Sequence, residues 1–381
     1  MRKGWEYKKL GEVCALTMGQ SPDGNSINEV NGIEFHQGKT CFGERFLGIS
    51  PLYSNAPTKL AEAHSVLLCV RAPVGYPNIT DRKICIGRGL CALYAKREID
   101  NSFLYYSLLG KQSYFEKNAT GSTFKAISSK IVSNTTLSIP PLSTQLAIVS
   151  ELDKINELIR LKKEQLKDFD NLAQSLFYEM FGDPVENEKG WEAKKLGEIG
   201  EFKNGLNFSK DENGHSIKFL GVSDFQNKKS IASDQLDCIS LSECVQEDYL
   251  LKTGDIVFVR SNGKKELIGR SVKMYITEPT TYSGFCIRCR ITDEKVDKDY
   301  IAILLKTPII RQFMTNSGRG CNISNLNQKI LNSIPTILPP LPLQRLFAQH
   351  IEQIEREKSE VQKSIQDLET LLASRMQYWF E

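Results

Sequence analysis

Few residues of this chain have the types and spacing that catalysis or metal binding requires. Residues 32–40 resemble a phosphate-binding loop, but five residues separate its two glycines where four are needed. Residues 87–92 match the spacing of a dinucleotide fingerprint, but a strand-like segment follows where a helix is required. Cys286 and Cys289 form a single C-x-x-C pair, which favours buried thiols over a zinc site. The sequence therefore predicts no catalytic site and no metal site.

Polar loops that occur twice carry side chains suited to nucleic acid. Arginine can bridge a guanine edge or a phosphate, asparagine and glutamine can pair with adenine, and glycine-rich loops offer N–H groups to phosphates. Such loops lie at residues 19–22 and 204–207, at 71–75 and 260–263, and at 119–125 and 318–324. Ordinary polar turns and salt-bridged arginines are the alternative for any single residue. The candidate DNA contacts are Gln20, Ser21, Arg71, Gly75, Ser122, Thr123, Lys125, Asn204, Asn207, Arg260, Asn262, Arg319, Asn322 and Ser324.

The chain that carries these loops is a tandem repeat. GWEYKKLGEV at residues 4–13 returns as GWEAKKLGEI at residues 190–199, an offset of 186. Later segments are 199 residues apart, so the second unit is 199 − 186 = 13 residues longer. A repeat of this length indicates a duplicated domain rather than a solenoid. We expect domains at residues 1–139 and 184–338, each followed by a helix, at 140–183 and 339–381.

Each globular unit has the pattern of a mixed α/β (α+β) fold. Apolar runs at residues 65–71 and 254–260 predict buried strands, and residues 84–94 and 285–291 predict further strands. Residues 102–117 and 299–315 read as helices, with Asp100 or Asn101 as a cap for the first. The recurring loops follow these strands and helices.

Two long segments have the heptad spacing of a coiled-coil seam. The two seams match position by position, 199 residues apart, and a lysine interrupts each one. Double prolines precede both helices, with Ser143 or Thr144 as a cap for the first. The seam residues are Ile148, Leu152, Ile155, Ile159, Lys162, Leu166, Phe169, Ala173, Leu176 and Met180, and Phe347, Ile351, Ile354, Lys358, Val361, Ile365, Leu368, Leu372, Arg375 and Trp379.

The order of the segments predicts how the helices pair. A compact domain usually has its two ends close together, so the second helix begins near the end of the first. The seams can then meet only if the helices are antiparallel, which gives a pseudo-twofold arrangement with one globular unit at each end. A helix of this kind spans roughly 57 Å, at about 1.5 Å per residue.

Composition and charge are typical of a folded intracellular protein. Its 381 residues are 40% apolar, and no stretch is apolar enough for a signal peptide or a membrane span. Ten cysteines without paired spacing favour reduced thiols, and therefore the cytoplasm. The net charge is +3, but residues 1–139 hold 17 basic and 11 acidic side chains, whereas residues 140–183 hold 5 and 8. Basic lobes on acidic helices give weak support to a phosphate-bearing partner.

The whole chain resembles the specificity subunit of type I restriction-modification systems. The resemblance is carried by the repeated GW-E-x-KKLGE opening, the Val-Arg-x-x-x-Gly turn at residues 70–75, the glycine loop at 121–131, and the I-P-P-L-x-x-Q helix start. The helix start is repeated at residues 338–344 as L-P-P-L-x-x-Q. The resemblance implies two target recognition domains that each read half of a bipartite DNA site, with helices that set the gap between the halves. It also implies that the second unit, which differs in its loops, reads a different half-site.

The same resemblance implies partners and places the cofactors. Two methyltransferase subunits would dock on the helices, and restriction subunits would join through them. The S-adenosylmethionine, Mg²⁺ and ATP sites would belong to those partners, so we expect no cofactor in this chain and no membrane partner. Apolar residues off the seam are candidates for docking, although packing against the chain's own lobes is the alternative near the helix ends. They are Leu158, Leu161, Leu172, Phe177, Leu371, Met376 and Phe380.

We therefore predict a non-catalytic subunit that reads double-stranded DNA and holds partner enzymes on its helices. A coiled-coil assembly adaptor whose lobes bind protein is the alternative. An autonomous methyltransferase or nuclease is a third interpretation, which predicts that the isolated chain binds a cofactor.

Overall fold

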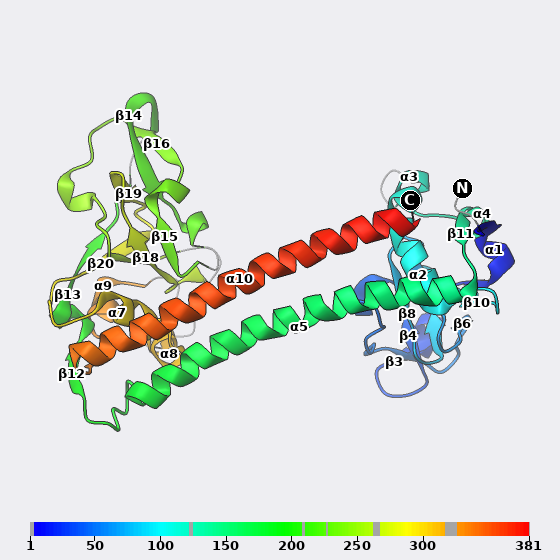
Figure 1. The fold of residues 1–381 in the computed structure, drawn as a ribbon, viewed down its shortest axis with the longest axis horizontal. Coiled ribbons are helices and arrows are strands. Elements are labelled where there is room, and N and C mark those ends of the chain that lie inside the picture. The colour runs from blue at the N-terminus through cyan, green and yellow to red at the C-terminus, as the bar shows by residue number, and fades with distance from the viewer. Residues whose placement is uncertain are drawn as a thin grey trace. The chain divides into compact units, whose positions relative to one another are not determined.

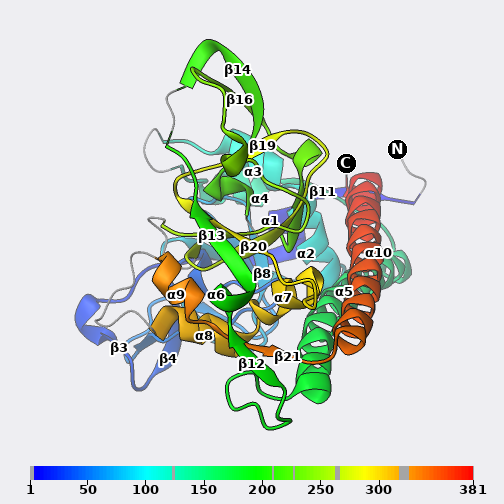
Figure 2. The same cartoon turned by 90° about the vertical axis from the view of Figure 1, so that its left-hand side faces the viewer.

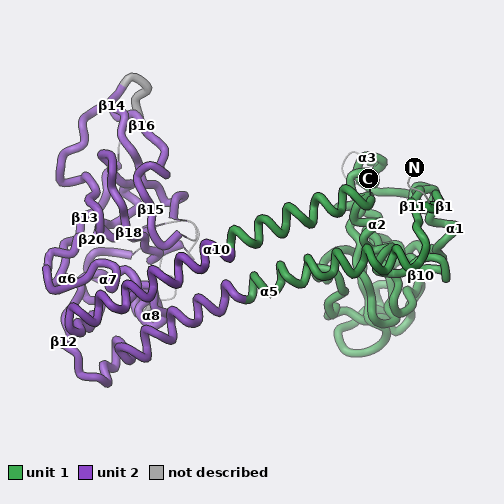
Figure 3. The backbone as a smooth tube through the Cα atoms, in the orientation of Figure 1, with its two compact units in different colours: residues 1–164, 362–381 green, residues 165–361 purple. Residues whose placement is uncertain are grey.

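The structure is a computed structural model that describes residues 4–121, 125–207, 210–225, 228–261, 267–316 and 326–380, apart from the side chains of residues 210–213. The chain forms two compact units, coloured separately in Figure 3. Unit 1 comprises residues 1–164 and 362–381, and unit 2 comprises residues 165–361. Each unit therefore contains one globular lobe and half of each long helix.

The lobe of unit 1 is built on a sheet with the strand order β2-β10-β7-β8 and a second sheet with the order β3-β5-β4-β9-β6. Two hydrophobic clusters fill it, and the larger one also contacts the long helices. Its elements are β1 (Glu6–Lys9), α1 (Leu10–Val13), β2 (Cys14–Met18), β3 (Ile27–Asn28), β4 (Ile33–His36), β5 (Tyr53–Ser54), β6 (Leu60–Ala61), β7 (Val66–Cys69), β8 (Pro77–Ile79), β9 (Ile84–Ile86), β10 (Leu90–Ala95), α2 (Asn101–Gly110), α3 (Gln112–Asn118), α4 (Ser129–Asn134) and β11 (Thr136–Ile139).

The lobe of unit 2 repeats this plan with a sheet of order β13-β20-β17-β18-β15 and a second sheet of order β16-β14-β19. The β14–β16 pair extends away from the first sheet (Figure 2). Its elements are β12 (Glu192–Lys195), α6 (Leu196–Ile199), β13 (Gly200–Asn204), β14 (Lys210–Leu220), β15 (Ser230–Ala232), β16 (Cys238–Leu241), β17 (Ile256–Val259), β18 (Ser271–Tyr275), β19 (Thr280–Tyr282), β20 (Cys286–Ile291), α7 (Lys298–Leu304), α8 (Pro308–Asn316), α9 (Gln328–Asn332) and β21 (Pro335–Leu338).

The predicted strands and helices are present, with three adjustments. Residues 84–94 form two strands rather than one, because the turn at residues 87–89 moves β9 into the second sheet. A Cβ on Gly89 would lie 2.2 Å from the carbonyl oxygen of Gln37, so only glycine fits this close approach. The helix predicted at residues 102–117 is divided into α2 and α3, and the one predicted at residues 299–315 is divided into α7 and α8. Asp100 caps α2 as predicted, and Asp297 caps α7 in the same way.

The repeated opening motif is part of the scaffold. In both copies the backbone N–H of the second lysine, Lys9 or Lys195, donates to the side chain of a glutamate in the following short helix. This hydrogen bond caps the N-terminus of that helix. β1 pairs with β11, and β12 pairs with β21, in antiparallel two-stranded ladders. Each lobe therefore begins and ends at adjacent strands, as the predicted helix pairing requires.

The long helices are α5 (Leu142–Phe181) and α10 (Leu341–Phe380), each continuous (Figure 1). Within unit 1, Glu151 of α5 bonds Arg375 of α10, and Lys163 pairs with Glu369 at 3.1 Å. As the residue number rises on α5 it falls on α10, so the helices are antiparallel.

The same order holds in unit 2, where Lys358 bonds Asp170 at 2.6 Å and Phe347 packs on Phe177 and Phe181. The predicted seam residues are all buried or half-buried, which confirms the heptad pattern. Lys358 interrupts the seam with its ammonium paired to a carboxylate, so its charge is compensated where it is buried.

A glutamine, rather than the predicted serine or threonine, secures the start of each long helix. α5 begins at Leu142, so Ser143 and Thr144 lie within its first turn. The Gln145 amide donates to the carbonyl oxygens of Pro140 and Glu98, and its oxygen accepts from the Asp100 N–H. Gln344 makes the equivalent bonds at the start of α10. This buried amide ties helix to lobe in both units, which explains the glutamine of the I-P-P-L-x-x-Q motif.

Candidate nucleic-acid interface

Three loops of unit 1 meet at one end of its main sheet. Met18, at the end of β2, pairs with Cys91, and Leu90, at the start of β10, pairs with Cys69, at the end of β7. The turns that continue from these strands therefore lie together. We call this the loop end of unit 1, formed by residues 19–22, 70–75 and 87–89.

The glycine loop joins the loop end through backbone hydrogen bonds. The Ala72 N–H donates to the carbonyl oxygen of Lys125 at 3.0 Å, and Arg71 forms a β-bridge with Ala126. Both Arg71 and Lys125 are exposed. Two predicted contacts from distant parts of the sequence thus lie side by side as cations that can reach a phosphate or a base edge.

Arg88 is an exposed cation that the sequence reasoning missed. It lies between two buried glycines in the turn from β9 to β10, at the loop end. Lys39 adds another, because its ammonium lies 3.4 Å from the ring centroid of Tyr76 and close to Cys69. The G-R-G tripeptide was the available signal, since it places an arginine on a turn where flanking side chains cannot fit.

The other predicted contacts of unit 1 in the described residues are Gln20, which is exposed, and Ser21 and Gly75, which are not. Gln20 is exposed, and its backbone N–H donates to the carbonyl oxygen of Ile86. The Ser21 hydroxyl is buried, and Gly75 is buried at φ +86° beside Phe115. Burial of the Ser21 hydroxyl and of Gly75 disfavours a DNA contact at either residue, and both contacts stay predictions.

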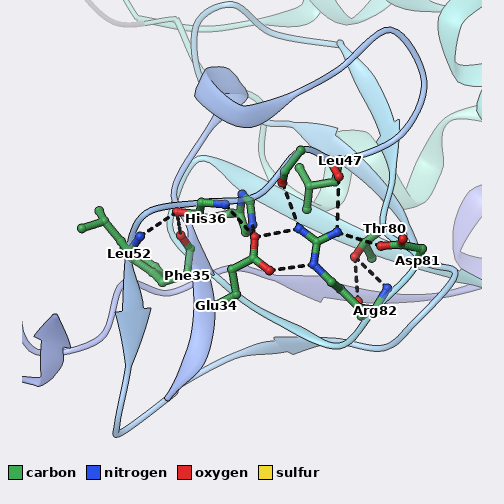
Figure 4. Close-up of polar contacts among 10 residues, drawn as sticks. Glu34, Phe35, His36, Leu47, Leu52, Thr80, Asp81 and Arg82 are labelled. Atoms are coloured by element: carbon green, nitrogen blue, oxygen red, sulfur yellow. Dashed lines mark hydrogen bonds and ion pairs between the residues drawn. The ribbon is translucent and has the colours of Figure 1, made fainter. Parts of the chain in front are cut away.

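A buried ion-pair network supports the loop end of unit 1. Figure 4 shows the Glu34 carboxylate between His36, at 2.8 Å, and Arg82, at 2.6 and 2.7 Å. Arg82 also donates to the carbonyl oxygens of Leu47 and Gly48, which joins two loops to β4. Burial alone would raise the pKa of Glu34, but these hydrogen bonds lower it to about 2. The network fixes β4, which pairs with β9 immediately before the turn that carries Arg88.

Unit 2 has an equivalent loop end, formed by residues 204–207, 260–261 and 283–285. Asn204, at the end of β13, pairs with Ile287, and Val259, at the end of β17, pairs with Cys286. Asn204 and Asn207 are exposed, and Asn204 accepts a hydrogen bond from the Gln328 amide at 3.1 Å. The described side chains here are mainly amides, which suit adenine edges.

The predicted equivalence of Arg71 and Arg260 is wrong by one residue. The Val70 N–H donates to Gly89 and the Arg260 N–H donates to Phe285, each at the start of the matching strand. The oxygens of Val70 and Arg260 accept from residues 127 and 326, which are 199 apart in the repeat. Arg260 therefore occupies the position of Val70, and Ser261 that of Arg71. Because successive residues of an extended chain point to opposite sides, the two arginines present their side chains differently; Arg260 is half-buried.

Phe285 is a residue of unit 2 that the sequence reasoning missed. Its side chain is 57% exposed at the loop end of unit 2, beside the backbone of Arg260. An exposed phenylalanine is unusual next to amide side chains, and an aromatic ring can stack on a base or contact a thymine methyl group. Ser122, Thr123, Asn262, Arg319, Asn322 and Ser324 lie outside the described residues.

A comparison of sequences places this arrangement in a known family. The sequence pattern described as the type I restriction modification DNA specificity domain matches residues 2–168 and again residues 188–370. The chain belongs to the type I restriction-modification specificity family.

Individual relatives agree with this assignment. The specificity subunit is 36% identical over 176 residues to the MjaX specificity subunit of Methanocaldococcus jannaschii, covering 45% of this chain and 41% of that protein. It is 22% identical to the type I restriction enzyme MjaVIII specificity subunit of the same organism, over 97% of this chain and 92% of the relative. The long match is distant and the closer match spans less than half of the relative.

Solved structures show the same fold. A crystal structure of the type I restriction-modification S subunit from M. genitalium has a TM-score of 0.53, with 18% identity, over 99% of this chain and 96% of that one. A chain from a structure on complex assembly and conformational transition of the type I R-M system has a TM-score of 0.68, with 18% identity, over 100% and 98%. The α+β architecture with paired long helices is therefore that of specificity subunits.

The docking residues predicted on the long helices divide into exposed and buried sets. Leu158, Leu161, Leu172 and Leu371 are between 46% and 51% exposed. Leu172 and Leu371 occupy equivalent positions in the repeat. These four leucines remain candidates for a docking surface.

Phe177 and Phe380 are buried in the cores of units 2 and 1 respectively, and Met376 packs against the core of unit 1. The docking prediction is wrong for the two phenylalanines, since each is covered by its own lobe. Phe380 lies against Phe103, with ring centroids 5.5 Å apart.

Two further observations bear on metal binding and on membrane insertion. Cys286 and Cys289 lie on opposite faces of their sheet, in separate hydrophobic clusters, so they cannot share a metal ion. Burial raises the pKa of each thiol to about 12, which keeps both protonated. No helix in the described part of the specificity subunit is long and apolar enough to cross a membrane.

Proposed function

We propose that this specificity subunit reads a bipartite, asymmetric site in double-stranded DNA, with the loop end of each unit bound to one half-site. The observation that carries the proposal is the convergence of loops from distant segments at the same end of two equivalent sheets. The loops bring exposed cations together in unit 1 and exposed amides with an aromatic ring in unit 2. Arginine suits guanine and amides suit adenine, so the two half-sites differ in sequence.

The proposal gives this chain recognition and leaves the chemistry to partner subunits. Two methyltransferase subunits dock on α5 and α10, and restriction subunits join the assembly through them. The exposed leucines at positions 172 and 371 support this arrangement, because they are repeat-equivalent and offer one apolar contact to each of two identical partners. S-adenosylmethionine, Mg²⁺ and ATP bind to those partners rather than to the specificity subunit.

A binding selection tests DNA readout directly. The specificity subunit is mixed with its methyltransferase partner and a library of random duplexes, and the bound fraction is sequenced after a gel shift at a stated salt concentration. We expect enrichment of two short sequences separated by a fixed gap. Complexes that assemble but enrich no sequence would instead favour the assembly adaptor.

Calorimetry on the isolated chain tests the assignment of the cofactors. Titration with S-adenosylmethionine is expected to give no heat of binding, whereas the assembled complex binds it. Saturable binding by the isolated chain would support an autonomous methyltransferase and contradict the proposal.

The helices are proposed to set the length of the gap. Insertion of seven residues, one heptad, into both α5 and α10 keeps the a/d seam in register. The selection should then return the same half-sites with a longer gap, because about 10 Å of helix has been added at 1.5 Å per residue. An unchanged gap would show that the helices do not set it.

A further inference from the structure

Unit 2 contains a cavity of about 720 Å³ where its lobe meets α5 and α10. Its apolar wall includes Phe177 and Ile351, and its polar wall includes three lysines, Lys229, Lys273 and Lys306. A cavity of this size, with an apolar wall and a few polar groups, is typical of small-molecule sites. All residues that line it belong to unit 2.

The equivalent position in unit 1 can be located from backbone hydrogen bonds. The Ile79 N–H donates to the oxygen of Arg45, and the Lys273 N–H donates to the oxygen of Lys229. β8 and β18 hold equivalent places beside β7 and β17. Arg45 is therefore the counterpart of Lys229, and Ile79 is the counterpart of Lys273.

In unit 1 two aromatic rings occupy part of this position, and a more open hollow remains along the neighbouring face of α5. Counted from the aspartate that caps each helix, Tyr105 and Tyr106 of α2 correspond to Ala302 and Ile303 of α7. The guanidinium of Arg45 lies 5.5 and 5.3 Å from the two tyrosine ring centroids. Ala302 and Ile303 both line the cavity of unit 2, so smaller side chains there leave the space that the two tyrosines occupy in unit 1.

Two of the three lysines have carboxylate partners inside unit 2. Lys229 pairs with Glu355 at 2.6 Å and with Asp170 at 3.6 Å. Lys273 pairs with Asp299. Asp297 and Glu352 also line the cavity; Asp297 accepts from two backbone N–H groups of α7, and Glu352 pairs with Arg356. Each carboxylate of the cavity wall therefore already has a partner.

Lys306 is different, because no carboxylate of the described residues lies within 4.0 Å of its ammonium. Its one hydrogen bond donates to the backbone oxygen of Lys229 at 2.8 Å, which leaves two N–H donors. Burial, and then the charge of Lys229, lower its pKa to about 7. Leu109 is the residue at this place in unit 1, counted from the helix cap, so the fold does not require an ammonium. Lys306 is half-buried, so an anion in the cavity would replace water at its two remaining donors.

We propose that this cavity binds a small organic anion that carries a ring, with a carboxylate or phosphate oxygen accepting from Lys306. The ring takes the space that the tyrosines occupy in unit 1 and packs on Ala173, Ile303 and Ala348, which are half-buried residues of the cavity wall. The anionic group supplies the acceptor that Lys306 lacks. The site is separate from the loop end and requires neither DNA nor a partner subunit.

The test is calorimetric titration of the full chain at constant ionic strength. Phenyl phosphate and benzoate are the probes, and they distinguish a phosphate from a carboxylate. Benzyl alcohol has the ring without the charge, and inorganic phosphate has the charge without the ring. We expect saturable binding of at least one ringed anion, and binding at least about tenfold weaker, or none, for both controls.

Variants then locate the site. Lys306→Met should weaken binding by at least about tenfold, and Lys306→Gln is a second form if the methionine variant does not fold. Lys252→Met, which removes an exposed lysine outside the cavity, is the matched control and should bind as the wild type does. Filling the cavity with the tyrosines of unit 1, by Ala302→Tyr with Ile303→Tyr, should abolish binding while the far-UV circular dichroism is kept.

The proposal is overturned if neither ringed anion binds better than benzyl alcohol, or if the folded Lys306 variants bind as tightly as the wild type. Persistent binding by the folded double-tyrosine variant overturns it as well. Because no DNA is present in these titrations, such results leave the proposed DNA readout unaffected.

Discussion

The loop ends of the two units have the same backbone plan and different side chains. In unit 1 the described exposed residues are the cations Arg71, Arg88 and Lys125, with Gln20 beside them. In unit 2 they are Asn204, Asn207 and Phe285, with Arg260 half-buried. Strand pairing and the hydrogen bonds that shape the turns are equivalent. Such a fold can change its recognition residues without changing its scaffold, because the scaffold is held by main-chain bonds and buried residues.

The units also differ below the surface, at the junction of lobe and helices. Unit 2 gathers Phe177, Phe181, Tyr300 and Phe347 into one aromatic cluster. The equivalent positions in unit 1 hold Met376, Phe380, Phe103 and Ile148, of which only the two phenylalanines are aromatic. The same junction can therefore be packed in two ways, which is why unit 2 leaves space that Tyr105 and Tyr106 occupy in unit 1.

The largest difference between the two units is expected from Arg82→Leu, which should lower the stability of unit 1 and leave that of unit 2 unchanged. It leaves the Glu34 carboxylate, 11% exposed, with only His36 and a backbone N–H as partners. We expect a loss of about 3 kcal/mol in the free energy of unfolding of unit 1, measured by denaturant titration. Asp81→Asn is the control, since it removes the exposed partner of Arg82 and should change stability by under about 0.5 kcal/mol. Equal losses from the two changes would show that Glu34 does not depend on Arg82.

The second prediction compares the contributions of Arg71 and Arg260 to DNA binding by the two loop ends. Arg71→Ala and Arg260→Ala should each weaken binding to one half-site by about 1–3 kcal/mol if the arginine contacts a base. Competition titrations with duplexes altered in one half at a time give the measurement. Ser261→Ala, at the true counterpart of Arg71, provides the control for register. Equal losses on every duplex would identify phosphate contacts instead.

A smaller and more uniform effect is expected from Lys125→Ala. An exposed lysine suits a phosphate contact, so affinity should fall by about the same amount on all sequences. The slope of log K against log salt concentration should decrease by about 1. Lys130→Ala is a nearby control on α4. Loss of affinity restricted to one half-site sequence would contradict the assignment to a phosphate.

The smallest change is expected from Phe285→Ala, and it should contrast with Lys125→Ala. Without the aromatic ring, unit 2 can no longer stack on a base or pack on a thymine methyl group. Affinity for its half-site should fall by about 1 kcal/mol, and the salt slope should stay unchanged because no charge is removed. Affinity measured at several salt concentrations separates the two cases. Tyr94→Ala, which removes an exposed aromatic ring of β10 in unit 1, should leave both half-sites unaffected.

Residues with strong periodicity or repetition were predictable from sequence. The heptad seams, with Lys162 and Lys358 included, follow from a spacing that only a helical pair satisfies. The position of the buried strands followed from apolar runs, and the antiparallel pairing of the helices followed from the order of repeat and helix. Each of these predictions depends on local pattern or on chain connectivity, and both can be obtained directly from the order of the residues.

The candidate interface was only partly predictable, because surface roles depend on single-residue register. Arg71 and Arg260 look equivalent in sequence, yet one residue of offset separates them in the strands. Ser21 and Gly75 have suitable types, but the folded turns bury them. Arg88 is marked only by its flanking glycines and Phe285 by no pattern, and the pairing of strands brings both to a loop end.

The duplicated α+β plan and the antiparallel pairing of the long helices could be predicted from the sequence alone, because hydrophobic spacing and repeat order are properties of the chain. Tertiary structure decided which polar residues meet, since strands distant in sequence bring residues such as Arg71, Arg88 and Lys125 together. Tertiary packing also determines where a cavity remains. The choice between Tyr106 and Ile303 affects the cavity volume only because a helix, a sheet and a cation surround that position in the folded unit.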